Sequence, residues 1–384
     1  MIFNIHNKKV RAVAIQTFLS VVIIMLISYF GNNLVDNLKR LGISSGFDFL
    51  QYRAGYDLYS PILSYSADST HLMALWVGLL NTIIITIFGM FLATVLGFTM
   101  GVLRLSDNWI VVKTMYVIIE FVRNVPVLIW IVIWYFGVFL QLPSPRAAIN
   151  IMDSVFVSNR GLYLPAPIFT TGASAIGIAL IIGIVLKVIY SRLAKAEHIK
   201  TGKESPVWRV SIALIIGLPL VVYFLAGQPI DWSMPELKGF NFKGGMALKP
   251  EFVSLLMGLS LYTACSIAEI VRAGILSVSS GQKEAAEALN LTKSQSMKMI
   301  VIPQAMCVII PPLNSQYLNL AKNSSLAIAI GYVDIVATIG GVTLNQTGQA
   351  VECIAIVMLV YLILSLIISS VMNYINNKVQ IIER

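Results

Sequence analysis

Few side chains in this sequence have the type and spacing to do chemistry, and the first are two acid–base pairs inside apolar segments. Glu120 precedes Arg123 and Glu269 precedes Arg272, each by three residues. On a helix this spacing puts both charges on one face, where each partly offsets the burial cost of the other. A structural ion pair is the simpler interpretation, and contact with a substrate that carries both charges is the alternative.

Side-chain amides form the second group. Gln316, Asn319 and Asn323 recur at spacings of three and four residues, which makes one polar stripe of a helix. The upstream pair 311–312 is Pro-Pro, which would free backbone carbonyls. Broken polar helices occur at membrane depth where they line a cavity or pack on protein. The candidate residues of a substrate pathway are Asn314, Gln316, Asn319, Asn323, Glu120 and Glu269; hydrogen bonding between helices is the alternative for the amides.

The sequence offers no recognisable catalytic or metal site. Neither a G-x-x-x-x-G-K-[ST] phosphate loop nor a Gly-x-Ser-x-Gly turn occurs. The histidines are isolated, and the cysteines lie in apolar stretches without a spaced partner. These residues are His6, His71, His198, Cys265, Cys307 and Cys353. We therefore expect no enzyme, no cofactor and no metal.

Composition places the chain in a membrane. Apolar residues make up 57% and charged residues 12% of its 384 positions, which is more apolar surface than one soluble core can hide. Runs of about 20 apolar residues, long enough to cross a bilayer as helices, recur along the chain. We predict an all-α, polytopic fold with about eight transmembrane helices, the first an uncleaved anchor. They lie near residues 12–30, 72–103, 118–141, 169–190, 210–226, 251–271, 304–322 and 348–374.

The basic residues orient these spans. With the N-terminus inside, cytoplasmic segments carry 17 of the 27 Lys and Arg residues and outer segments carry 9, while Arg123 lies within a span and is assigned to neither side. This asymmetry is typical of membrane proteins. We expect both termini in the cytoplasm. The net charge of +9 then follows from topology and from contact with membrane lipid, and gives no support to a nucleic-acid partner.

Small residues recur every fourth position in the second span, at Ala93, Gly97 and Gly101. One face of that helix therefore lacks bulky side chains and allows another backbone to approach closely. We assign this stripe a packing role only, within the subunit or across a dimer.

A helical loop follows the sixth span. Residues 283–289 are all good helix formers, and Asn290 tolerates the left-handed conformation that ends a helix. Thr292 and Gln295 match a capping box that starts another helix. The loop is predicted to form two short helices at a fixed angle; an alanine-rich surface helix with ordinary caps is the alternative.

This loop resembles the Glu-Ala-Ala loop of ABC importer permeases, whose consensus is Glu-Ala-Ala, three residues, Gly, nine residues, Ile-x-Leu-Pro. The matching residues are Glu284, Ala285, Ala286, Ile300 and Pro303, while Asn290 stands for the usual Gly and Ile302 for the usual Leu. In that family the loop docks into a cleft of a separate ATPase. The resemblance implies that Glu284, Ala285, Ala286, Asn290 and Pro303 couple this chain to an ATPase. We expect the two alanines to lie on the docking surface, exposed in the free subunit.

Resemblance to permeases of polar amino-acid ABC importers, most closely the general L-amino-acid permeases, extends over most of the chain. It is carried by residues 78–82, 104–106, 123–126, 268–277 and 311–326. It implies a type I permease core of five helices, to which the first span and the pair near 169–226 add three. We divide the chain into an anchor and outer loop (1–71), a permease domain with the extra hairpin and a coupling loop at 277–303 (72–345), and a last helix with a cytoplasmic tail (346–384).

The expected function is that of a permease subunit of an ATP-driven importer, moving L-amino acids across the bacterial inner membrane. The resemblance implies three partners: a cytoplasmic ABC ATPase, a second homologous permease in a heterodimer, and a periplasmic amino-acid-binding protein. The alternative is an ion-coupled secondary amino-acid transporter, which needs no capped helix pair facing the cytoplasm. A membrane-embedded enzyme is a weaker rival, because the sequence shows no paired catalytic groups at membrane depth beyond the two ion pairs.

Overall fold

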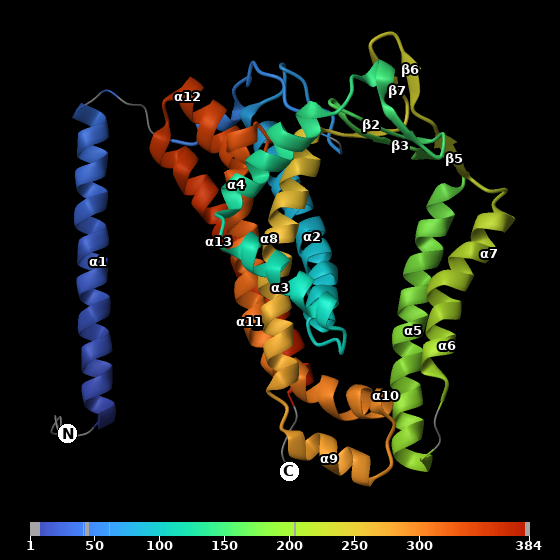
Figure 1. Cartoon of the computed structure of the whole chain (residues 1–384). Helices are drawn as coiled ribbons and strands as arrows, with labels where there is room; N and C mark the ends of the chain where they lie inside the picture. Colours follow the sequence, from blue (N-terminus) through green and yellow to red (C-terminus); the bar gives the residue numbers. More distant parts are fainter. Residues whose placement is uncertain (1–7, 41, 43–45, 61, 203–204, 381–384) are drawn as a thin grey trace. The chain divides into compact units, whose positions relative to one another are not determined.

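The computed structural model of the chain describes residues 8–40, 42, 46–60, 62–202 and 205–380, and within them the fold is mostly helical, as predicted (Figure 1). The chain divides into two compact units. Unit 1 holds the described residues of Met1–Trp134 and Ser254–Arg384, and unit 2 is Tyr135–Val253. The last residues of the expected cytoplasmic tail, 381–384, lie outside the described residues.

Seven of the described helical runs are long and apolar enough to cross a membrane, and a bent pair makes an eighth. This confirms the predicted number of spans. In unit 1 the long helices are α1 Lys8–Arg40, α2 His71–Leu103, α3 Trp109–Arg123, α8 Pro250–Leu276, α11 Ile302–Asn323 and α13 Ala350–Val379. The shorter elements there are η1 Asp48–Gln51, α4 Val127–Val132, α9 Ser280–Ala288, α10 Lys293–Ser296, η6 Met297–Val301, η7 Ser324–Ile330, η8 Val336–Thr343 and α12 Leu344–Thr347. Apart from α1, unit 1 holds five of the expected spans, which agrees with a core of five helices.

The third predicted span, 118–141, is wrong as a straight helix. Two helical pieces, Trp109–Arg123 and Val127–Gln141, meet there at an angle of 101°. The break falls at Val125-Pro126, because proline has no N–H to continue the helix and its ring disfavours the helical conformation of the preceding residue. A helix that bends so sharply is a broken span or a re-entrant segment.

The seventh predicted span, 304–322, is too short. Its helical run extends from Lys293 to Ile330, since η6 joins its start and η7 continues its end. Both Pro311 and Pro312 lie inside α11. The expectation that this proline pair breaks the helix is therefore wrong: the helix passes through and forgoes two backbone hydrogen bonds.

Unit 2 contains the extra hairpin, formed by α5 Ala173–Thr201, α6 Val207–Ile212, η5 Ala213–Gly217 and α7 Leu218–Leu225. Its first helix, α5, corresponds to the fourth predicted span, 169–190, but starts later and runs 11 residues further. A Cβ on Gly183 would lie 2.1 Å from the Leu214 carbonyl oxygen, so α5 packs closely against η5. The hairpin is one compact pair of helices.

Short strands, which the sequence did not predict, flank this hairpin. Three small antiparallel sheets have the strand orders β1-β2-β3-β8, β4-β5 and β6-β7. The strands are β1 Ile149–Ile151, β2 Val155–Ser158, β3 Gly161–Leu164, β4 Ala166–Phe169, β5 Ile230–Ser233, β6 Glu236–Lys238, β7 Asn241–Lys243 and β8 Met246–Leu248; the short helical pieces before them are η2 Ile133–Val138, η3 Phe139–Gln141 and η4 Pro145–Ala147. Unit 2 therefore contains three small sheets in addition to the predicted pair of helices.

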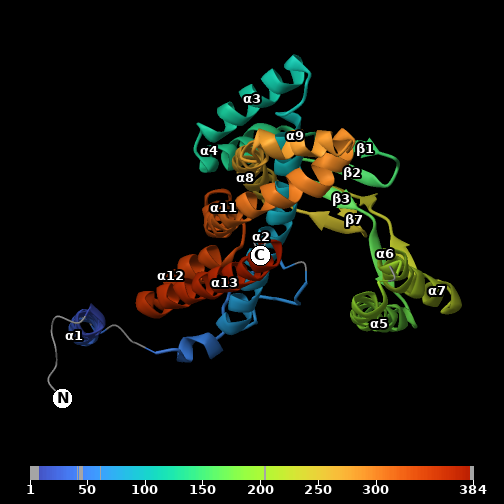
Figure 2. The same ribbon diagram turned by 90° about the horizontal axis from the view of Figure 1, so that it is seen from below.

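The core of unit 1 is built where α2, α8 and α11 stand side by side (Figures 1 and 2). A Cβ on Gly97 would lie 2.6 Å from Ile267 Cβ, and one on Gly101 would lie 2.8 Å from the Ala268 carbonyl oxygen. The predicted packing role of the small-residue stripe is thus confirmed, with α8 as the partner. Farther along α8 a Cβ on Gly274 would lie 2.3 Å from Ile309 of α11, so α8 also packs closely against α11.

We predict that Gly97→Leu destabilises the folded subunit, because the added side chain overlaps Ile267 and the α8 backbone. Overpacking of this kind costs about 1–3 kcal/mol. The matched control is Gly177→Leu, since nothing lies within 4 Å of the position of its Cβ in α5. Thermal unfolding of the purified subunits in detergent checks this, and equal melting temperatures for the two variants would contradict it.

Candidate functional site

The loop after α8 forms the caps that its sequence predicts. After α9, Asn290 has a φ of 55°, the left-handed conformation, and its N–H donates to the Glu287 carbonyl (2.8 Å). Thr292 and Gln295 make both bonds of a capping box at the start of α10. The helix stop and the capping box are therefore confirmed, and the direction of the chain on both sides of the turn is set by local hydrogen bonds.

The second helix of the loop is not short. It continues from α10 through the π-helical turn η6 into α11 without a break. Pro303 stands at the start of α11, and because it has no N–H, the turn before it lacks one ordinary helical hydrogen bond. The loop therefore consists of one short helix, α9, and the extended end of a transmembrane helix.

The side chains of α9 divide between an inner and an outer face. Ala286 is 0% exposed, because it faces the side on which α9 packs against η6. Glu284 and Ala285 are exposed, since each residue turns the helix by about 100°. The expectation that Ala286 is exposed is therefore wrong. Leu289, which sequence reasoning did not single out, is 73% exposed beside them.

A side-chain hydrogen bond joins α9 to the base of α11. Gln304 Nε2 donates to Gln282 Oε1 at 3.3 Å, which links the start of α9 to α11.

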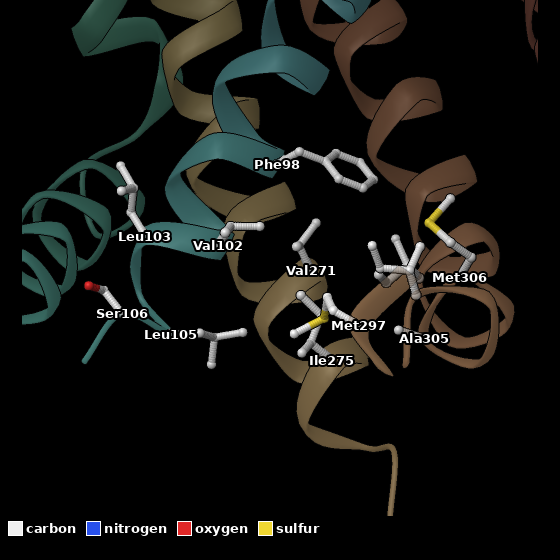
Figure 3. Close-up of a pocket in the computed structure, with 12 residues that line it drawn as sticks. Phe98, Val102, Leu103, Leu105, Ser106, Val271, Ile275, Met297, Ala305 and Met306 are labelled. Carbon is white, nitrogen blue, oxygen red and sulfur yellow. The ribbon is translucent and has the colours of Figure 1, made fainter. Parts of the chain in front are cut away.

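An apolar pocket of about 510 Å³ opens at the base of the loop (Figure 3). Its lining comes from α2 and the turn after it, α8, η6 and α11: Phe98, Val102, Leu103, Leu105, Ser106, Val271, Ile275, Met297, Ile302, Ala305, Met306 and Ile309. The junction of the loop with the membrane helices is therefore not filled by side chains.

Charged residues cluster where α2 and α8 end. Glu269 pairs with Arg272 (3.1 Å) and also with Arg104, which caps α2. Glu120 and Arg123 lie 3.8 Å apart, each with a side chain 40% exposed. Glu269 thus binds two arginines and ties α8 to α2, which supports the structural interpretation of that pair. Sequence reasoning missed Arg104 because it lies 165 positions from Glu269.

The amide candidates on α11 do not share one environment. Asn319 is exposed, whereas Gln316 and Asn323 are half-buried. Asn314 instead faces α13, where it lines a cavity of about 130 Å³ with Asn373 and Asn376. The structure therefore separates Asn314 from the stripe formed by the other three.

A buried carboxyl group, Asp334, lies in the connection between the spans Lys293–Ile330 and Ala350–Val379, and its side chain is 0% exposed. One oxygen accepts from the Ala337 N–H (2.8 Å) and the other from the Tyr361 hydroxyl of α13 (3.3 Å). Desolvation by burial raises the pKa of Asp334 to about 7. Hydrogen bonding only partly offsets the cost of removing this group from water.

The backbone around Asp334 is tied to α2. Asn81 Nδ2 donates to the Val333 carbonyl (2.8 Å), and the Ile335 N–H donates to Thr82 Oγ1 (3.0 Å). Sequence reasoning did not select this site. The available signal was that Asp334 is the only Asp or Glu between Glu287 and Glu352. A lone carboxyl in so apolar a stretch is unusual.

Comparisons with known proteins give one family match in the second half of the chain and relatives that cover nearly all of it. Residues 206–381 match the family described as "Binding-protein-dependent transport system inner membrane component". The "Putative amino-acid ABC transporter permease protein YhdX" of Escherichia coli (strain K12) is 47% identical over 98% of this chain and 96% of its own. The "General L-amino acid transport system permease protein AapQ" of Rhizobium johnstonii is 46% identical over 99% and 94%. The "Glutamate/glutamine/aspartate/asparagine transport system permease protein BztB" of Rhodobacter capsulatus is 39% identical over 99% and 96%.

We predict that Asp334→Asn removes a pH dependence of stability. Because the pKa in the folded chain is above that of the unfolded chain, the protonated carboxyl favours folding, and this contribution is lost as the pH rises from about 4 to about 7. The melting temperature of the unmodified chain should therefore fall over that range, and that of Asp334→Asn should fall less. Asp107→Asn, which changes an exposed carboxyl, is the control. If the melting temperatures of the unmodified chain and of Asp334→Asn changed equally with pH, the raised pKa of Asp334 would be refuted.

Proposed function

This chain belongs to the permeases of amino-acid ABC transporters, and we propose that its α9 couples it to a cytoplasmic ATPase. In this proposal the exposed face of α9, formed by Glu284, Ala285 and Leu289, enters a cleft of the ATPase. Glu284 supplies a charge, Ala285 permits close approach, and Leu289 supplies apolar area. Ala286, Asn290 and Pro303 act indirectly, by fixing how α9 is held.

The observation that carries this proposal is that α9 is fixed on one face and free on the other. Ala286 is fully buried, Gln282 is bonded to Gln304, and Asn290 closes the helix in a left-handed turn. Leu289, at the end of α9, is nevertheless 73% exposed, and the exposure of such an apolar side chain to water is unfavourable. A rigid element with an unpartnered apolar tip is suited to transmit force from a second protein.

The path of that force runs through the membrane helices. The ATPase would move α9, the contact at η6 would pass the motion to α11, and the pocket of about 510 Å³ leaves room for the η6 junction to shift. ATP binding would then bias the equilibrium between inward-open and outward-open states, since a ligand acts only through its different affinity for the two.

The direction of transport and the partners are part of the same proposal. Both termini lie in the cytoplasm, which puts α9 on the side of the ATPase. A periplasmic binding protein would deliver an L-amino acid, since the family description names dependence on a binding protein and the names of the relatives give amino acids as cargo. A second, homologous permease would complete the path in a heterodimer, with the exposed Asn319 of α11 on its wall and Gln316 and Asn323 beside it. Transport driven by an ion gradient without ATP would favour the secondary-transporter alternative.

We predict that Ala285→Trp and Glu284→Lys uncouple the permease and leave it folded. Exposed substitutions cost the fold only about 0.5 kcal/mol, whereas a large ring in a close-packed interface costs about 1–3 kcal/mol. The retention of the ATPase during purification should weaken, and ATP-dependent uptake into proteoliposomes should be lost.

Two controls separate coupling from folding. Ala196→Trp, on an exposed position of α5, should leave both ATPase retention and uptake unchanged. Ala286→Trp should instead lower the melting temperature of the subunit by itself, because that side chain is buried. Full uptake by Ala285→Trp and Glu284→Lys would show that α9 is not the coupling element.

We further predict that Asn319→Leu lowers uptake while the ATPase stays bound, because the exposed amide would face the path of the substrate. Ser370→Leu, a similar gain of apolar surface at an exposed position of α13, is the control and should transport normally. Radiolabelled uptake and co-purification are the two measurements. Loss of assembly in Asn319→Leu would indicate instead that the amide joins helices.

A further inference from the structure

The two ends of the α5–α7 hairpin differ strongly in charge. The segment 187–209 at one end contains six Lys and Arg residues against two Glu. The segments 165–172 and 226–235 at the other end contain one Asp and no Lys or Arg. Of the six basic residues, Lys203 lies outside the described residues. One end of this hairpin therefore attracts anions and the other does not.

A cavity of about 290 Å³ lies at the basic end, lined by Ser191, Ala194, Lys195, His198, Ser205 and Val207. Four of these residues occupy one face of α5, since they follow the three- and four-residue spacing of a helix. The Ser191 hydroxyl is buried and has no hydrogen-bond partner among the described residues. An ammonium group and hydroxyl donors around one cavity are the groups that bind a phosphate oxygen.

The surroundings of this cavity are those of a membrane surface. Ile199 and Leu193 of α5 are 74% and 64% exposed, and Trp208 at the start of α6 is 65% exposed. The 29 residues of α5 measure roughly 43 Å, longer than the hydrocarbon core of about 30 Å. The basic end therefore extends into the head-group layer, where tryptophan and lysine side chains concentrate.

We propose that this cavity binds the phosphate head group of an anionic phospholipid, with its acyl chains along the exposed apolar side chains of the hairpin. Lys195 pairs with the phosphate, and Ser191 and Ser205 donate hydrogen bonds to it. A free phosphate ion would use the same donors but gain nothing from Leu193, Ile199 and Trp208. An acidic protein surface would not enter a cavity between two lipid-facing helices. The lipid is therefore the occupant that uses both the charge and the apolar flank.

The test measures lipid retention by the purified full chain. Native mass spectrometry should detect phosphatidylglycerol retained in preference to phosphatidylcholine, and Lys195→Gln should reduce the apparent affinity for phosphatidylglycerol by about fivefold. The control is the double change Lys238→Gln with Lys243→Gln, which removes two positive charges from the strands of unit 2 and should leave the affinity unchanged. Because Lys195 is exposed, its replacement should not alter folding in phosphatidylcholine.

Three results would overturn the proposal. Equal retention of phosphatidylcholine would exclude recognition of the anionic head group. Displacement of phosphatidylglycerol by millimolar inorganic phosphate would indicate an ion site. Unchanged lipid affinity in Lys195→Gln, with loss of a co-purifying acidic protein, would assign the basic end to protein contact instead.

Discussion

The structure of unit 1 depends on the close approach of α2 and α8. A buried charge network joins these two helices at one end. Glycines at 97 and 101 let the two backbones come close, and Arg104 at the end of α2 binds Glu269 of α8. In a membrane the alternative to such pairing is an isolated charge in a medium of low dielectric constant, which costs several kcal/mol. Since α9 follows α8 within a few residues, the same contact sets where α9 begins.

At their other ends, the core helices are joined by neutral hydrogen bonds around a single carboxyl group. Asn81 and Thr82 of α2 bind the backbone beside Asp334, and Tyr361 of α13 binds its side chain. One end of α2 is thus held by an ion pair and the other by a polar network. A change in helix packing must break or move one of these two connections, so they are the places where alternative states of the permease would differ in energy.

The sequence predicted most features whose causes are local. Hydropathy predicted the number of spans. The left-handed cap at Asn290 and the capping box at Thr292 followed from side-chain chemistry. The spacing of the glycines indicated a packing face. What could not be predicted came from contacts far apart in the chain. The direction that Ala286 faces depends on where α9 packs, the second arginine on Glu269 comes from another helix, and the helix through Pro311-Pro312 persists because its neighbours hold it. The bend at Pro126 had a local signal, but the two prolines inside α11 show that the same signal can also leave a helix unbroken.

The uninterrupted run from Lys293 to Ile330 has a mechanical consequence. Its 38 residues span roughly 57 Å at the helical rise, more than the full thickness of a bilayer. If this helix pivoted near η6, its far end would move about 8 Å for a tilt of only about 10°. A small displacement at α9 would therefore be larger where it reaches Asp334, which bonds Tyr361 of α13.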